Sequence, residues 1–439
     1  MERLPKCVDY STPLATMPDG TVNYLVSNTP INNSQFTPGS TIIVDLNNVP
    51  AFLDPASLSF RYKYTAVTSS YSATTSGRVG IVSCPCYTPF VRCDILCNSA
   101  VVESINNWNT LASMLSNTTL SVSEKFGQAT SLGYSGTGGD TMDNQNDVDG
   151  IILVAAQTAT ASAQTVSNYV SAPLIGCSLA YSEKLIPLDV NWRIQLTLDS
   201  LTNIFSSLST DIVPASYTIT NFEIVYNQIQ FPMPVYNQIK MSPKLRIKTK
   251  SFAIGSSAIS SGSSGTINLY YNLRYASIRS LFLCCAPTAN TFASKALESI
   301  DVTNNSGSYQ FSVSGVVMPQ NPMSTINNKS GILNELRRAM GSIYDRSNSL
   351  SIGGTEFVAV PTTTTTIEIP GKFYVAVNCQ KLTESQDYMF TGVSSANSQI
   401  NVIINTSTAV PAAINAYLIA NYDAIFEIDT LTRQLNYIQ

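Results

Sequence analysis

The sequence predicts an all-β protein made of two tandem β-sandwiches, and three observations lead to this fold class. Short alternating or β-branched runs, broken by Gly, Pro, Asn and Ser, recur along the 439 residues. Helical patterns are rare, so a parallel α/β architecture is not supported. The strings SYTITNFEIVY and AYLIANYDAIF align without a gap, with Tyr217 and Tyr417 as their second residues. Such a match indicates one β unit written twice.

Three further pairs of stretches match in the same order in the two halves. GSTIIVDLNNVPAFLDPASLSFRYKY, from Gly39, resembles SGTINLYYNLRYASIRSLFLCCAP, from Ser264, and each predicts a strand, a break and a second strand. VRCDILCNSAVV and SYQFSVSGVVMPQNP each predict a strand, a tight turn and a Val-Val pair. WRIQLTL precedes the first repeated string as SQINVII precedes the second. Four matches in one order favour a duplicated domain.

The expected organisation is an arm followed by two sandwiches. Residues 1–38 are polar and turn-rich and read as an extended N-terminal arm before the first strand. The first sandwich is expected over 39–235 and the second over 236–439. The boundary falls in QFPMPVYNQIKMSPK, where three prolines interrupt strand pairing. Stretches rich in Ser, Thr, Gly and Ala, at 66–78, 131–172 and 255–265, are expected to project from the sandwiches as loops.

Two short helices are expected in loops, each covering a sandwich. Ser104 is the expected N-cap of the first, and its apolar positions are Ile105, Trp108, Leu111, Ala112 and Leu115. In NKSGILNELRRAMGSIYD the apolar stripe is Ile332, Leu336, Met340 and Ile343.

Composition restricts the function. Charged residues make up 12% of the chain, about half the usual share of roughly 25%. A surface so poor in charge suits a protein whose flanks lie against neighbours. The net charge of −4 provides no global basic field for nucleic acid. One basic cluster is a solvated strand face or a contact for genome or acidic lipid; its members are Lys240, Lys244, Arg246, Lys248 and Lys250.

Few catalytic or metal sites are compatible with the residues present. The chain has no histidine, which excludes Ser-His-Asp and Cys-His nucleophile systems and histidine-ligated metals. Among nine cysteines, Cys84, Cys86, Cys93 and Cys97 are a zinc set or, as the spacing favours, small buried strand residues. The N-terminus lacks the apolar core of a signal peptide, and no stretch has the length of a membrane span. We predict no catalytic residue and no cofactor.

Two sets of polar residues remain as candidate sites. The acidic tract GTGGDTMDNQNDVDG is a solvated loop or a weak calcium site, although it lacks EF-hand spacing; its ligands would be Asp140, Asp143, Asp147 and Asp149. On the repeated strings, Phe222, Tyr226 and their counterparts Tyr422 and Phe426 are expected to face the core. The opposite face is expected to form structural hydrogen bonds or to meet a partner; it carries Asn221, Glu223, Asn421 and Asp423.

Taken together, the tandem sandwiches, polar arm, projecting loops, short helices and C-terminal ANYDAIFEID strand resemble the double jelly-roll major capsid proteins of icosahedral double-stranded DNA viruses. The similarity is nearest to the smaller proteins of virophages and Polinton-like elements. It implies two eight-stranded jelly rolls and homotrimers that act as pseudo-hexameric capsomers. It also implies contacts with neighbouring capsomers, penton and minor capsid proteins, and an internal membrane or genome at the inner face. The chain would be synthesised in the host cytoplasm, reside in the virion and act on no small-molecule substrate.

Two other functional classes of protein remain open. A secreted or surface β-sandwich adhesin or carbohydrate-binding protein would predict a signal peptide and often paired cysteines. A glycoside hydrolase or lyase on a β scaffold would need two convergent carboxylates in a cleft, and no pair stands out in the sequence.

Overall fold

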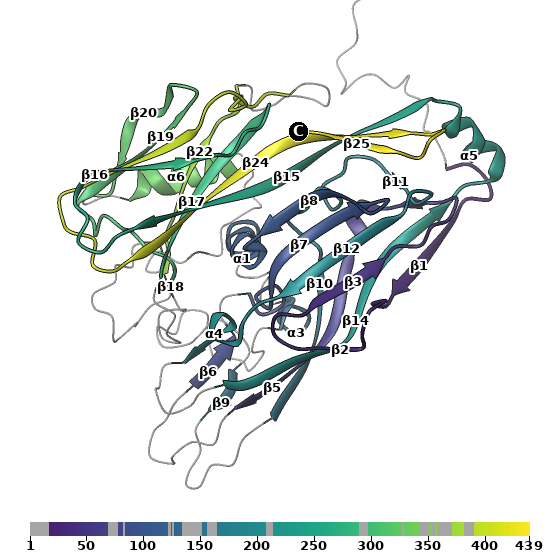
Figure 1. The fold of residues 1–439 in the computed structure, drawn as a ribbon, viewed down its shortest axis with the longest axis horizontal. Helices are drawn as coiled ribbons and strands as arrows, with labels where there is room; N and C mark the ends of the chain where they lie inside the picture. Colours follow the sequence, from purple (N-terminus) through teal and green to yellow (C-terminus); the bar gives the residue numbers. More distant parts are fainter. Residues whose placement is uncertain are drawn as a thin grey trace, which may run out of the picture.

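The fold was analysed in a computed structural model that describes most of the chain. The described residues are 17–68, 78–81, 84–121, 124, 127–133, 152–155, 165–207, 214–288, 297–326, 329–341, 352, 357, 371–381 and 390–439. Figure 1 shows two β-sandwiches, one built from the first half of the chain and one from the second half.

The first sandwich consists of two antiparallel four-stranded layers. One layer has the order β1 (Val22–Asn28), β14 (Pro214–Gln230), β5 (Ser59–Thr68), β10 (Thr165–Pro173). The facing layer has the order β3 (Thr41–Asp45), β12 (Trp192–Leu198), β7 (Phe90–Cys97), β8 (Ala100–Asn106). Three short strands extend the first layer: β2 (Gln35–Phe36), β4 (Phe52–Leu53) and β11 (Ile186–Pro187).

The second sandwich repeats this order strand for strand. One layer is β15 (Lys244–Ile259), β24 (Ile414–Asp429), β17 (Ile278–Pro287), β22 (Tyr374–Asn378). The other is β16 (Gly265–Tyr271), β23 (Ile400–Thr406), β19 (Gly307–Val313), β20 (Val316–Ser324). A ninth strand, β25 (Leu435–Ile438), pairs with the C-terminal part of β24. Eight strands in two facing layers, in the same order in both halves, form two jelly rolls.

The repeats seen in the sequence occupy equivalent strands, which confirms the predicted duplication. The two strings of the first match lie on β14 and β24, and WRIQLTL and SQINVII lie on β12 and β23. The strand–turn–strand repeats form the hairpins β7–β8 and β19–β20. Their turn residues Asn98, Ser99, Ser314 and Gly315 all have positive φ, between 49° and 78°. That geometry is required by two-residue type I′ turns.

Strand pairing starts earlier than the arm prediction implied. β1 lies within the segment 1–38 and pairs with β14 over seven residues, from Val22–Gln230 to Asn28–Ile224. The sequence does not predict β1 because β1 is an edge strand. Its first four residues are all exposed, so its sequence lacks the alternation of buried and exposed residues that is typical of a half-buried strand. The three predicted loops are also shorter than expected, since residues 66–68 belong to β5, 165–172 to β10 and 255–259 to the strand Lys244–Ile259.

The two predicted helices exist, with one boundary corrected. α1 (Trp108–Thr119) starts after Asn107, so Ser104 is not its cap: Ser104 and Ile105 lie on β8. Asn107 has a left-handed backbone (φ 54°) and separates strand from helix. In α6 (Ser330–Met340), Ile332 and Leu336 are buried as expected, and Ile343 lies outside the described residues. A third helix, α5 (Met233–Lys240), occupies the predicted boundary.

Several minor elements complete the described chain. They are η2 (Pro55–Ser57), α3 (Ala129–Leu132), α4 (Leu201–Ile204), β6 (Arg78–Ile81), β9 (Ile152–Ala155), β13 (Phe205–Ser207), β18 (Leu297–Ser299) and β21 (Gly371–Lys372). Across the described segments, none of the helices has the length and apolar character needed to cross a membrane.

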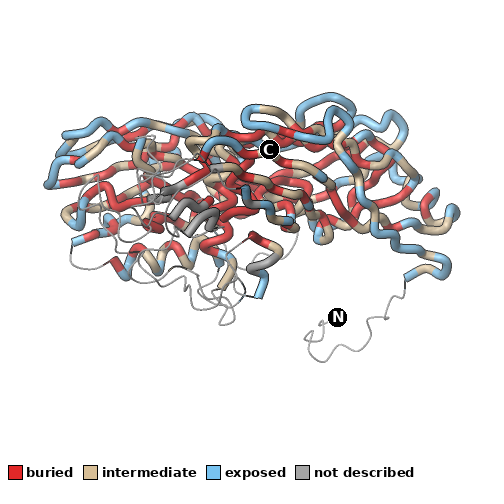
Figure 2. The backbone as a smooth tube through the Cα atoms, turned by 90° about the horizontal axis from the view of Figure 1, so that it is seen from below, coloured by how far each residue is buried: buried red, intermediate tan, exposed pale blue. Residues whose placement is uncertain are grey.

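The core fills the space between the layers of each sandwich, where buried backbone follows the strands (Figure 2). In the first sandwich, Phe60, Tyr62, Phe90, Trp108 and Phe222 form one aromatic cluster with ring centroids 5.5–6.4 Å apart. The four residues predicted to face the core are all buried: Phe222, Tyr226, Tyr422 and Phe426. Phe426, however, packs against Trp192 of the first sandwich.

Candidate functional site

The four polar residues predicted on the repeated strands do not meet one another; each pair stays in its own sandwich. Asn221 is exposed with φ 51°, at a bulge in the β14–β5 pairing. Glu223 accepts a hydrogen bond from Ser27 Oγ on β1 at 2.7 Å.

The second pair is more enclosed. Asn421 donates to Ser280 Oγ at 3.4 Å, and Asp423 accepts from Ser277 Oγ at 2.7 Å and lies 3.4 Å from Arg279. Asp423 is 3% exposed, so it has almost no surface to present to a partner. A partner-facing role for Asn221 stays a prediction.

The sequence offers two candidate metal sites, the aspartates of the acidic tract and the set of four cysteines. The four aspartates of the acidic tract lie outside the described residues. Within the described segments, no three His, Cys, Asp or Glu side chains are placed to hold a metal ion. All eight described cysteines are buried and none of them is in a disulfide. A hydrogen bond with Cys177, and then burial, raise the pKa of Cys93, which disfavours the thiolate that zinc requires.

The basic cluster makes ion pairs and ring contacts within the chain, while the side chains of Lys244 and Arg246 stay 52% and 69% exposed, as expected for a solvated strand face. A contact with genome or acidic lipid stays a prediction. Glu427 on β24 binds both Lys244 (2.6 Å) and Arg246 (2.7 Å), and these hydrogen bonds lower the pKa of Glu427. Lys240 contacts Asp189 at 2.5 Å.

The other two members of the cluster contact the loop between β10 and β12. Lys248 lies 3.7 Å from Glu183, and Lys250 lies over the ring of Tyr181 at 4.6 Å. The carboxylates and the ring that hold the cluster come from segments remote in sequence.

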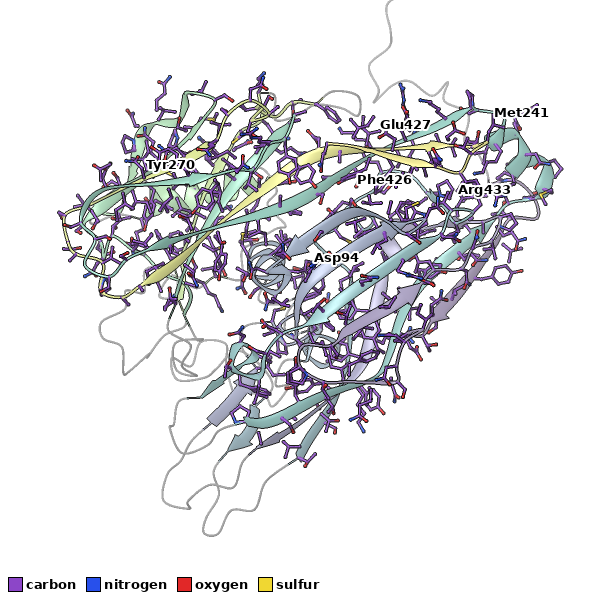
Figure 3. All side chains as sticks on the ribbon, in the orientation of Figure 1. Asp94, Met241, Tyr270, Phe426, Glu427 and Arg433 are labelled. Atoms are coloured by element: carbon purple, nitrogen blue, oxygen red, sulfur yellow. The ribbon has the colours of Figure 1, made fainter. Side chains whose placement is uncertain are left out.

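The contacts of Lys240, Lys248 and Lys250 form part of a junction between the two halves of the chain, whereas the Glu427 pairs lie within the second sandwich. The first sandwich contributes β8, the Asn98–Ser99 turn and the loop between β10 and β12. The second contributes β15, β24 and β25, and Figure 1 shows β15 and β24 passing over the first sandwich. Phe426, Glu427 and Arg433 lie along this side of the molecule (Figure 3).

Both polar and aromatic contacts bind the halves together at the junction. Asn98 Nδ2 donates to the carbonyl of Arg433 at 2.7 Å, and the Glu183 amide donates to the carbonyl of Lys248 at 3.1 Å. Trp192 packs edge-on against Phe426, with centroids 5.5 Å apart. Tyr181 packs in the same way on Phe252 at 5.9 Å.

A buried glutamate lies at the junction. Glu103 Oε2 accepts hydrogen bonds from both the backbone N and the Oγ of Ser178, each at 2.8 Å. Ser178 in turn accepts, through its carbonyl, from Thr249 Oγ1 of the second sandwich at 2.5 Å. Oε1 of Glu103 is buried and has no hydrogen-bond partner among the described residues. Burial raises the pKa of Glu103 to about 7, and the Ser178 hydrogen bonds only partly oppose this.

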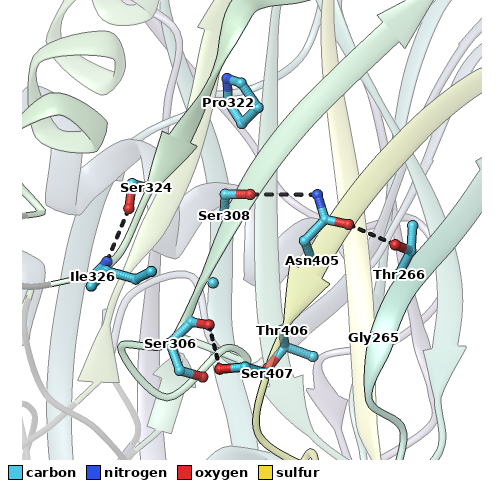
Figure 4. Close-up of a pocket in the computed structure, with 11 residues that line it drawn as sticks. Gly265, Thr266, Ser306, Ser308, Pro322, Ser324, Ile326, Asn405, Thr406 and Ser407 are labelled. Atoms are coloured by element: carbon cyan, nitrogen blue, oxygen red, sulfur yellow. Dashed lines mark hydrogen bonds between the residues drawn. The ribbon is translucent and has the colours of Figure 1, made fainter.

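A shallow groove lies at one end of the β16–β23–β19–β20 layer (Figure 4), with a volume of about 500 Å³. Hydroxyl and amide side chains line most of it, and Asn405 bridges Thr266 (2.8 Å) and Ser308 (3.5 Å). The lining contains no carboxylate and no aromatic ring. Glycosidase chemistry requires a pair of carboxylates, so this groove cannot supply it.

Comparison with known proteins places the fold. No family model matches the chain, and no curated protein matches it. The PBCV-1 virus capsid matches with a TM-score of 0.58 at 7% identity, over 97% of this chain and 99% of that one. The Faustovirus major capsid protein matches with 0.58 at 10%, over 94% and 91%. The mavirus major capsid protein matches with 0.55 at 12%, over 100% and 95%. The chain therefore has the double jelly-roll fold of these proteins, along its whole described length.

Proposed function

We propose that this chain is a major capsid protein that builds an icosahedral virion shell and performs no catalysis. The observation that carries the proposal is the full-length double jelly roll, since the similar structures named as capsid proteins cover at least 91% of both chains. The low charge content and the absence of histidine agree with a structural role.

The mechanism is geometric. Two sandwiches with the same strand order stand side by side in one chain, and three chains would place six such sandwiches in a ring. A trimer of this kind has a pseudo-hexagonal outline and can tile a shell through contacts between copies. Apolar burial between neighbours stabilises the shell, and charge is not needed there.

Further partners follow from the same proposal. Neighbouring capsomers would meet the flanks of the trimer, and penton and minor capsid proteins would complete the shell. The inner face would contact an internal membrane or the genome. The protein would be made in the host cytoplasm and would be found in the virion.

The test is the assembly state of the purified full chain. Size-exclusion chromatography with light scattering should give a trimer or larger species, and negative-stain microscopy should show capsomers of pseudo-hexagonal outline. A stable monomer that binds glycans saturably would overturn the capsid proposal in favour of a surface adhesin or carbohydrate-binding protein.

A further inference from the structure

The carboxyl group of Glu103 is enclosed at the junction without a compensating charge. Glu103 lies on β8 and is 5% exposed. Its Oε2 atom accepts two hydrogen bonds from Ser178, whereas its Oε1 atom is buried and has no hydrogen-bond partner among the described residues. None of the ion pairs between described residues includes Glu103. An ionised carboxylate is costly in such a place, since neither a cation nor a full set of donors offsets its loss of water.

The titratable side chains around Glu103 are neutral groups from several elements. They belong to β7, the segment after β10, the loop between β16 and β17, β24 and β25, and they are Cys93 with its partner Cys177, Tyr275, Tyr422 and Tyr437. Burial contributes to raising the pKa of Cys93 and of all three tyrosines, so these thiol and phenol groups keep their protons at neutral pH.

The charged side chains of the same elements have other partners. They interact as follows: Arg92 with Asp94, Lys248 with Glu183, Lys250 with the Tyr181 ring, Arg274 with Asn272, Asp423 with Ser277 and Arg279, Glu427 with Lys244 and Arg246, and Arg433 with Tyr236 of α5. Proton loss from Glu103 would therefore leave a buried negative charge with no cation paired to it.

The C-terminal strand β25 is the part of this enclosure with the fewest neighbours. It has four residues and pairs with β24 alone, whereas β15 and β24 pair with each other over 16 residues. Figure 1 shows β25 running with β24 over the first sandwich. A short terminal edge strand opens at a lower free-energy cost than the long strands beside it.

Tyr437 connects β25 to the buried glutamate. Its hydroxyl lies 3.4 Å from that of Tyr422, and its side chain also interacts with Ser178, the residue that donates to Glu103. The ring of Tyr437 packs on Phe426, with centroids 5.4 Å apart. The turn before β25 is held to the first sandwich by Asn98, which donates to the carbonyl of Arg433 at 2.7 Å.

We propose that β25 is a strap that closes over Glu103 while this residue is protonated and opens when it ionises, which loosens the junction between the two jelly rolls. The device goes beyond the proposed function, because it belongs to a single chain whatever that chain assembles into.

The direction of the response follows from the burial of the carboxyl group. Burial raises the pKa of Glu103 to about 7 in the closed chain, and contact with water in the open state returns it towards the ordinary 4.5. The open state therefore binds fewer protons between these two values, so opening becomes more favourable as pH rises through this window. From pH 5 to pH 8 the opening constant should rise tenfold or more, with roughly seventyfold as the upper limit.

The first experiment measures hydrogen–deuterium exchange of the full chain by mass spectrometry from pH 5 to pH 8. Rates are divided by the intrinsic exchange rate at each pH. In the wild type, the protection of β25 should fall tenfold or more over this range, and the segment around Ser178 should lose protection with it. In Glu103→Gln, which cannot ionise, the protection of β25 should stay constant. Strand β16 (Gly265–Tyr271) is the internal control and should behave alike in both proteins.

The second experiment weakens the strap without touching Glu103. Tyr437→Phe keeps the ring and removes the hydroxyl that contacts Tyr422 and Ser178, so β25 should exchange several-fold faster than in the wild type already at pH 5. Tyr270→Phe is the matched control, because Tyr270 is 61% exposed on β16. The control should exchange like the wild type.

The outcomes are separate from those of the capsid proposal. Protection of β25 that is constant with pH in the wild type, or that falls equally in Glu103→Gln, would refute the strap. Exchange of β25 in Tyr437→Phe that matches the wild type would refute the part assigned to Tyr437. A chain that stays monomeric but shows the expected response would keep this inference and overturn only the capsid proposal.

Discussion

Replacing Glu103 by glutamine should make the folded protein less sensitive to pH. The glutamate is fully buried at the junction, and only one of its two oxygens has a hydrogen-bond partner among the described residues. Glutamine retains a carbonyl oxygen for Ser178 and cannot ionise, so it mimics the protonated acid. The packing at the junction should remain the same.

The magnitude follows from the pKa of Glu103. Burial raises it from the ordinary 4.5 to about 7, which corresponds to about 3 kcal/mol. A carboxyl group with a raised folded pKa binds more protons in the folded state than in the unfolded state between these two values. The free energy of unfolding therefore falls as pH rises through this window, and the whole penalty is present above pH 7. Below pH 4.5 the group contributes nothing.

The assay is urea unfolding of the wild type and Glu103→Gln from pH 5 to pH 8, at one protein concentration. The difference between them should be small at pH 5 and should grow to as much as about 3 kcal/mol in favour of the variant at pH 8. Other titrating groups cancel in this difference. The neighbouring ionisable groups are Cys93 and three tyrosines, whose pKa values are all raised further above this window: Tyr275, Tyr422 and Tyr437. A difference that stays constant across the range would refute the assignment to Glu103.

Three further predictions test a close approach, a buried ion pair and a left-handed turn. Gly307→Ala places a Cβ 1.9 Å from a backbone oxygen of β23 and should lower the free energy of unfolding by about 3 kcal/mol. The control Gly331→Ala, whose Cβ meets nothing within 4 Å, should be neutral or slightly stabilising. An equal effect of the two substitutions would contradict the close approach at Gly307. Lys329→Met removes the 2.9 Å cationic partner of the buried Asp301 carboxylate and should cost about 3–5 kcal/mol in urea unfolding. A loss under about 1 kcal/mol would show that the hydrogen bonds to Asp301 from Thr303, Asn305 and Tyr309 suffice without the lysine. Ser99→Gly, at φ 68°, should raise the melting temperature by relieving a left-handed backbone worth up to about 1 kcal/mol, and a lower melting temperature would mean that this turn needs the serine.

The duplication could be predicted because buried strand positions leave a strong trace in the sequence. β14 and β24 keep aromatic or aliphatic residues on their inward face, so their strings align position by position. The tight hairpin turns are equally local, since Asn98-Ser99 and Ser314-Gly315 supply the residues that tolerate positive φ. Both features are set by short stretches of consecutive residues, so they could be predicted from the sequence.

The junction could not be predicted, because its contacts join residues remote in the chain. Glu103 on β8 is buried and is linked through Ser178 to Thr249 of the second sandwich, residues that lie far apart in the sequence. Lys248 and Lys250 of β15 likewise contact Glu183 and Tyr181, which precede them by more than sixty residues. The strand β1 was missed for the opposite reason: its exposed apolar residues match no half-buried pattern.

The two copies of the jelly roll differ where their surroundings differ. β15 and β1 are equivalent strands, but β15 carries Lys and Arg whose carboxylate and aromatic partners lie in the same chain, whereas β1 has no charged residue. Lys248 is 18% exposed and contacts Glu183 across the junction, whereas Lys244 and Arg246 are 52% and 69% exposed and pair within the second sandwich. A partly buried charge is costly unless it is paired, so the junction can hold Lys248 because its partner lies in the same chain. Water and salt weaken the more exposed pairs, so the contacts of Lys248 and Lys250 contribute more to holding the two copies together than the Glu427 pairs do.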